Sequence, residues 1–111
     1  MTLSKRNDPF AALAHPIRRD ILVHLRDEPD LTAGAIAGLF PRVSRPAVSR
    51  HLAVLRRARL VRSRVLGRES HYRLNADTVA QVHTEWCVQF DAILEGSLER
   101  LKARVESDPG G

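Results

Sequence analysis

The sequence predicts a mainly α-helical fold with one small β-hairpin, in the order helix, helix, helix, helix, strand, strand, helix. Three observations support this order. Prolines and capping side chains divide residues 8–57 into four segments with helical spacing, two strand-like runs flank a glycine, and a long apolar stripe follows them. A chain of 111 residues is expected to form one domain, 1–111, with an ordered core over residues 8–105.

Prolines and small polar residues mark the ends of the first three helices. Asp8 and Thr32 stand where N-caps are expected, and the third helix is predicted over residues 33–40. The prolines that begin or end these helices are Pro9, Pro16, Pro29 and Pro41. The apolar residues expected to face inward are Phe10, Leu13, Ile17, Ile21, Leu22, Leu25, Ile36, Leu39 and Phe40.

A fourth helix and a hairpin follow a tight connection. Ser44 can cap this helix and Pro46 suits its first turn. Two strands are predicted over residues 61–66 and 70–74, and residues 67–69 form the turn between them. The residues of the fourth helix expected to be buried are Val48, Leu52 and Leu55.

The last helix is predicted over residues 76–105, with Asn75 or Asp77 as its cap. It carries more apolar surface than a small domain is expected to cover, which is typical of an interface, and pairing with the same helix of a second copy would bury it. The apolar residues along one side of this helix are Val79, Val82, Trp86, Phe90, Ile93, Leu94, Leu98, Leu101 and Val105.

The charges of the chain are unevenly distributed. Residues 42–73 contain ten arginines and one acidic residue, Glu69, whereas the rest of the chain has eight Lys or Arg and twelve Asp or Glu. A block of one sign repels itself unless a polyanion binds it. Arginine suits phosphates and base edges because its planar guanidinium can form two parallel hydrogen bonds. The block therefore predicts nucleic acid as the partner.

The fourth helix carries the residues expected to read DNA. At about 100° per residue, the face opposite its buried stripe presents small residues around Arg50, while Ser49 and His51 flank it. Arginine is the commonest specific partner of guanine in the major groove. A basic helix of this kind followed by a basic hairpin describes a winged helix-turn-helix. The predicted DNA-binding residues are Arg42, Ser44, Arg45, Pro46, Ala47, Ser49, Arg50, His51, Arg57, Arg62, Arg64, Arg68 and His71.

Two predicted features have alternatives that the sequence leaves open. Arg68, at the hairpin turn, either enters a narrow minor groove or remains a plain exposed residue beside the phosphates. His83 and Cys87 share a helix face at a spacing of four, which supplies half of a tetrahedral metal site or only a packed thiol beside an imidazole.

Several functional classes are disfavoured by what the sequence lacks. No run of 18 apolar residues is present, so no membrane span or membrane partner is expected. The single cysteine fits a reducing cytoplasm. No phosphate-binding loop, zinc-protease or hydrolase motif occurs, so neither an enzyme nor a bound cofactor is expected.

Three segments together resemble the arsenic-repressor-type (ArsR/SmtB) family of winged-helix regulators: residues 10–22, residues 44–55 and residues 67–74. The resemblance covers about residues 8–100. It implies a homodimeric cytoplasmic repressor on a palindromic operator, with the dimer built by the first and last helices. The interface residues that follow from this resemblance and from the apolar stripe are Phe10, Leu13, Val82, Trp86, Phe90, Ile93 and Leu94.

The chain departs from the family's metal sensors at their ligand positions. Thr32 and Gly34 stand where one group of sensors has paired cysteines. In the last helix Asp77 matches one ligand of the other group, but Val79, Phe90 and Ile93 replace the remaining ligands. The turn at residues 41–43 is also one residue longer than usual. We therefore expect no metal site.

The sequence accordingly predicts a homodimeric, sequence-specific DNA-binding repressor without the usual metal sites, and it identifies no inducer. One alternative is a repressor that releases DNA when a small organic ligand binds or an oxidant reacts near Cys87. Another is a non-specific architectural or RNA-binding protein, although the basic block lacks the interleaved aromatic residues that stack on bases.

Overall fold

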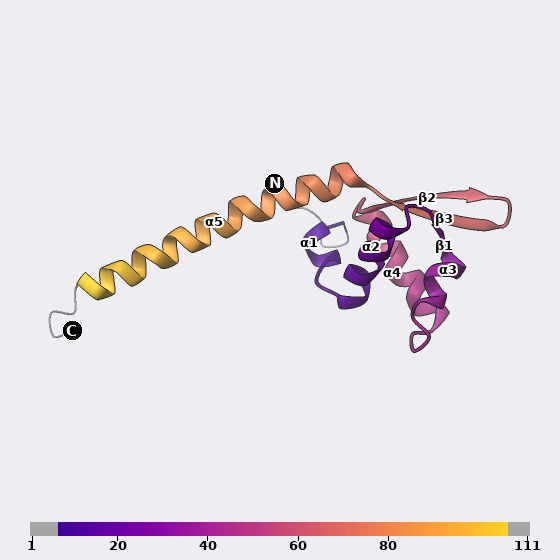
Figure 1. The fold of residues 1–111 in the computed structure, drawn as a ribbon, viewed down its shortest axis with the longest axis horizontal. Helices are drawn as coiled ribbons and strands as arrows, with labels where there is room; N and C mark the ends of the chain where they lie inside the picture. Colours follow the sequence, from indigo (N-terminus) through magenta and orange to yellow (C-terminus); the bar gives the residue numbers. More distant parts are fainter. Residues whose placement is uncertain (1–6, 107–111) are drawn as a thin grey trace. The chain divides into compact units, whose positions relative to one another are not determined.

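The computed structural model describes residues 7–106, and the chain divides into two compact units, Met1–Val79 and Ala80–Gly111. The predicted winged helix-turn-helix order is confirmed, with one short additional strand. The elements, labelled in Figure 1, are α1 (Pro9–Ala12), α2 (Pro16–Asp27), β1 (Leu31–Thr32), α3 (Ala33–Gly38), α4 (Arg45–Arg57), β2 (Val61–Leu66), β3 (Glu69–Leu74) and α5 (Ala76–Glu106).

The helices of the first unit begin at polar side chains that accept hydrogen bonds from otherwise unsatisfied backbone N–H groups. Asp8, Thr32 and Ser44 cap α1, α3 and α4 as predicted, at 2.9, 3.0 and 3.2 Å from the donating nitrogens. His15 caps α2 in the same way, because its Nδ1 accepts from the N–H of Ile17 at 3.1 Å. The starts of these helices are therefore set by short-range chemistry.

The inward-facing residues of α1 and α3 were only partly predicted. In α1 the buried residues are Pro9 and Ala12, while Phe10 and Leu13 are half-buried. A helix of a single turn has no extended stripe, so its spacing decides little.

The third helix is shorter than predicted and ends at Gly38 instead of residue 40. The N–H of Leu39 turns back to the carbonyl of Ile36 at 3.0 Å, and the Leu39 side chain is 41% exposed. The prediction that Leu39 faces inward is therefore wrong. Phe40, also predicted to face inward, is half-buried beside the ring of His24. Glycine favours this early end because it loses the most backbone entropy in a helix.

The core of the first unit is aliphatic. Full burial of each such side chain contributes about 1.5–3 kcal/mol. The predicted stripe of α4 is buried as expected, whereas Ile17 and Leu22 of α2 are only half-buried. The side chains that are at most 2% exposed are Ile21, Leu25, Ile36, Val48, Leu52, Leu55, Leu60 and Val61.

The sheet has three antiparallel strands in the order β1-β3-β2. Strand β1 was not predicted, because two residues show no alternation. It pairs Leu31 with Tyr72 and Thr32 with His71, and so ties the connection between α2 and α3 to the hairpin.

The hairpin turn is one residue shorter than predicted. Glu69 belongs to β3 and lies opposite Leu66, so only Gly67 and Arg68 form the turn. Gly67 has φ +64°, as the first central residue of a type II′ turn requires. A two-residue turn fixes the register of the hairpin, and this places Arg68 at its tip.

The end of α4 forms a Schellman cap that contains no glycine. The N–H of Leu60 bonds to the carbonyl of Leu55, and the N–H of Arg59 bonds to the carbonyl of Arg56, each at 3.0 Å. This geometry forces Arg59 to φ +62°, where glycine is usual. The side-chain amide of Asn75 donates to the carbonyl of Arg59 at 2.9 Å and fixes the strained residue.

The second unit consists of most of α5. Val82 is buried, but the next apolar residues of the predicted stripe are not, and Trp86 is 49% exposed. The rings of Trp86 and Phe90 lie 5.9 Å apart. The stripe residues that are about half-exposed are Trp86, Phe90, Ile93, Leu94, Leu98 and Leu101. Within residues 7–106, no helix combines the length and apolar character that crossing a membrane requires.

Candidate nucleic-acid interface

Helix α4 separates an apolar face from a basic one. Its stripe is buried, Ser49 and the arginines are exposed, and Ala47 and His51 are half-buried. The first turn contains no acidic side chain, so the positive end of the helix dipole is not offset. Helix ends of this kind attract phosphate. The remaining exposed members of the predicted set at this helix are Arg42, Ser44, Arg45, Pro46 and Arg57.

The arginines of the basic block have few acidic partners. Among residues 7–106, Arg64 is the only arginine of the block that forms an ion pair. The other arginines of the block are all exposed, so their charges remain available to a partner.

The two strands of the hairpin bring four basic residues to one face. Arg62 lies opposite Arg73, and Arg64 lies opposite His71. Residues two apart along a strand share a face, so all four lie on the same side of the sheet. Arg68 is exposed in the turn, as predicted. The structure thus gathers the predicted hairpin residues on one side and at the tip.

His51 connects α4 to the first turn of α2 and its cap. One guanidinium nitrogen of Arg18 lies 3.3 Å from Nδ1 of His51, while its Nε donates to the carbonyl of Ala12 at 2.6 Å. The ring of His51 lies 4.4 Å from the ring of His15. A guanidinium only donates, so Nδ1 of His51 accepts. This positional role was not predicted from the sequence.

The surroundings of His51 favour its neutral form. Burial is the main cause that lowers the pKa of His51, and the nearby positive charges of His15, Arg18 and Arg50 lower it further. The lowered pKa of His51 favours an uncharged ring, whose other ring nitrogen can donate a hydrogen bond to a partner.

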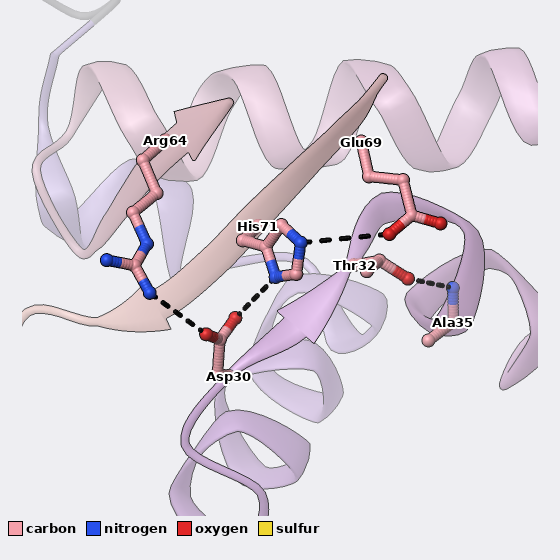
Figure 2. A network of polar contacts seen from close by, with 6 residues as sticks. All are labelled: Asp30, Thr32, Ala35, Arg64, Glu69 and His71. Atoms are coloured by element: carbon pink, nitrogen blue, oxygen red, sulfur yellow. Dashed lines mark hydrogen bonds and ion pairs between the residues drawn. The ribbon is translucent and has the colours of Figure 1, made fainter. Parts of the chain in front are cut away.

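Asp30 is a site residue that sequence reasoning missed. Nδ1 of His71 lies 3.0 Å from one carboxylate oxygen of Asp30, and Arg64 donates to the other at 3.4 Å (Figure 2). Nε2 of His71 is also 3.7 Å from Glu69. The hydrogen bond from His71 is the main cause that lowers the pKa of Asp30. No sequence signal marks Asp30, because the pairing of β1 with β3 brings it to the hairpin.

Within residues 7–106, the positions of the family's metal ligands are not part of any cluster of metal-binding side chains. In the described part of the chain, no three His, Cys, Asp or Glu side chains lie close enough together to hold a metal ion. Thr32 is the cap of α3, and its hydroxyl accepts from Ala35. Sγ of Cys87 lies 3.5 Å from Nε2 of His83, as their spacing on one face predicts.

The chain is similar to known regulators. The sequence model of a protein family described as a helix-turn-helix domain matches residues 13–64. The transcriptional repressor SdpR of Bacillus subtilis is 38% identical over 84 residues, which span 76% of this chain and 90% of that protein. A helix-turn-helix-type transcriptional regulator of Mycobacterium tuberculosis is 45% identical over 76 residues, or 68% of this chain and 69% of that protein.

Solved structures agree with these relatives. An ArsR-like transcriptional regulator from Rhodococcus sp. RHA1 has a TM-score of 0.67 and 33% identity, covering 88% of this chain and 87% of that one. A possible transcriptional regulator for arsenical resistance has the same TM-score and identity, with coverages of 92% and 97%. The chain belongs to the ArsR/SmtB family of transcriptional regulators. It is therefore a DNA-binding regulator of transcription, and the basic face of α4 with the hairpin is its candidate DNA interface.

Proposed function

We propose that this ArsR-family regulator is a homodimeric, sequence-specific repressor of a palindromic operator in the cytoplasm, and that it acts by binding and not by catalysis. One observation carries the proposal. The arginines of α4 and the hairpin are exposed and, Arg64 apart, have no acidic partner among residues 7–106. A surface with this charge is complementary to the DNA backbone.

The contacts divide into two kinds. Most arginines would bind phosphate and supply affinity that is independent of sequence. Arg50 and Ser49, exposed on the face of α4 opposite its buried stripe, would read base edges in the major groove. Helix α4 is therefore the recognition helix, and the hairpin is the wing that lies along the adjacent backbone.

A second copy supplies the symmetry that a palindrome requires. The exposed stripe of α5 is the surface that the second copy would cover, and Phe10 and Leu13 of the first unit would also contribute to the interface. Two recognition helices would then lie about 34 Å apart on one side of the duplex. Repression follows when the bound dimer blocks the polymerase, as the similarity to a transcriptional repressor supports.

DNA binding by this protein would not be regulated by the metal ions that other members of the family sense. Thr32 offers only a hydroxyl and Gly34 no side chain, and neither replaces a thiolate. Titrating the DNA complex with zinc, cadmium or arsenite should leave it intact. Release by one metal ion per site that is lost in Cys87→Ser would instead make Cys87 a sensor ligand.

Selection from a random duplex library tests the function directly. We expect an inverted repeat with half-sites about one helical turn apart, and a complex whose sedimentation corresponds to two chains per duplex. Affinity should fall steeply as salt concentration rises. Each phosphate contact should steepen the slope of log affinity against log salt concentration by about 0.9. Enrichment of no sequence, or a complex of one chain per duplex, would contradict the proposal.

A further inference from the structure

Asp30 lies between two basic side chains of the wing, Arg64 and His71. The pairing of Thr32 with His71 fixes the connection before β1 at the edge of the sheet. Arg64 lies opposite His71 on the next strand, so both side chains reach Asp30 from the same face (Figure 2). A carboxylate thus occupies the position between basic side chains that an anionic ligand would take.

The two contacts of Asp30 differ in strength. The contact with His71 is 3.0 Å long, and the His71 side chain is only 21% exposed. The contact with Arg64 is single, 3.4 Å long, and made by a side chain that is 56% exposed. Long, exposed ion pairs of this kind are weak and are screened by salt. Arg64 can therefore leave while Asp30 keeps its bond to His71.

The surroundings still attract an anion. A shallow hollow on this face is lined by Asp30 together with three arginines, Arg62, Arg64 and Arg73. Asp30 is ionised at neutral pH, since its pKa is lowered, so the positive charges of the hollow outnumber the negative one. Arg62 and Arg73 have no acidic partner among the described residues, and Arg64 alone is held back.

We propose that Asp30 competes with DNA phosphate for Arg64: the carboxylate holds the guanidinium on this face of the wing in the free protein and releases it to the DNA backbone on binding. Asp30 is thus a positioning residue that lowers the affinity for every sequence alike. The inference rests on the proposed function, because it requires the wing to contact DNA. It differs from a purely structural role, in which Arg64 would stay with Asp30 in the complex.

A double-mutant cycle between Asp30→Asn and Arg64→Gln tests this competition on a random duplex. Asparagine keeps an oxygen that accepts from His71 and removes only the charge, and thermal unfolding will verify the fold. We expect Asp30→Asn to raise affinity roughly twofold to fivefold per subunit, the range of an exposed ion pair. In the Arg64→Gln background, the ratio of affinities with and without Asp30→Asn should approach one. In the wild-type background the same ratio should decrease as salt concentration rises.

Glu28→Gln is the matched control, because it also removes one negative charge, two residues from Asp30. The side chain of Glu28 is exposed and forms no ion pair in the described region. Its effect should be smaller and independent of Arg64. Unchanged affinity in Asp30→Asn, an equal increase in the Arg64→Gln background, or an equal effect of Glu28→Gln would overturn the competition. A random duplex needs no operator, so loss of sequence preference alone would contradict the proposed function and leave this comparison readable.

Discussion

Helices α4 and α5 both carry apolar residues at helical spacing, but only one of them covers its stripe within the described chain. Leu52 and Leu55 of α4 are at most 1% exposed, whereas Ile93 and Leu98 of α5 are more than half exposed. Helix α4 contacts α1, α2, α3 and β2, which leaves only its basic face for a partner. The same sequence pattern therefore predicts an apolar side in both helices, and the neighbours decide whether that side forms a core or an interface.

The largest expected effect separates these two kinds of stripe. Leu52→Ala should lower the free energy of unfolding by about 2–5 kcal/mol, because it leaves a cavity in the core. Leu98→Ala should change monomer stability by less than about 0.5 kcal/mol but weaken self-association. Denaturant unfolding of dilute protein and sedimentation equilibrium measure the two quantities. Undiminished association of Leu98→Ala would show that this part of α5 does not form the interface.

The basic face of α4 should show a division of its own. Arg50→Ala is expected to cost about 1–3 kcal/mol of discrimination at one base position per half-site, because a bidentate base contact is lost. Arg62→Ala, in the wing, should weaken binding to all sequences alike. Competition binding with single-base operator variants measures both. If Arg50→Ala keeps the full sequence preference, another residue of α4 reads the groove.

The strained end of α4 offers a stabilising substitution. Arg59→Gly should raise the free energy of unfolding by up to about 1 kcal/mol, since glycine adopts φ +62° without the steric cost that arginine has there. Arg57→Gly is the control, because the same change in the last helical residue should destabilise by about 1 kcal/mol. Thermal unfolding of the two variants compares them, and destabilisation by Arg59→Gly would be inconsistent with strain at this residue.

The smallest expected effect is a pH dependence from His51. Because its pKa is lowered in the folded state, the unfolded chain binds the proton more readily. Stability should thus rise with pH between the folded value and about 6.5, the ordinary value for histidine, and level off above it. His51→Gln should flatten this part of the curve, as measured by unfolding from pH 5 to 8. A steeper fall towards acid in that variant would contradict the assignment.

The features that were predicted depend on near neighbours in sequence. The caps at Asp8, Thr32 and Ser44 form within three residues, and the stripe of α4 follows from spacing alone. The features that were missed depend on residues far apart. Asp30 meets His71 across 41 positions, and Arg18 meets His51 across 33, so no local pattern marks either contact.

The predictions for the end of α3 and for Glu69 were wrong for a different reason. Both depend on how a turn closes, and a turn can close one or two residues earlier without a change of pattern. The predicted DNA contacts and dimer residues stay predictions, although the structure leaves most of them exposed.

The use of arginine in the basic block has a chemical consequence. Residues 42–73 contain no lysine, and the chain has lysine only at Lys5 and Lys102. Guanidinium groups stay protonated throughout the pH range in which proteins fold. Lysine acetylation, lysine methylation and acylating reagents therefore have no target in this block. Arginine-directed reagents such as phenylglyoxal, in contrast, can modify its ten arginines. The arginine charge offered to DNA therefore does not change with pH, and a competing acid or a bound anion can offset it.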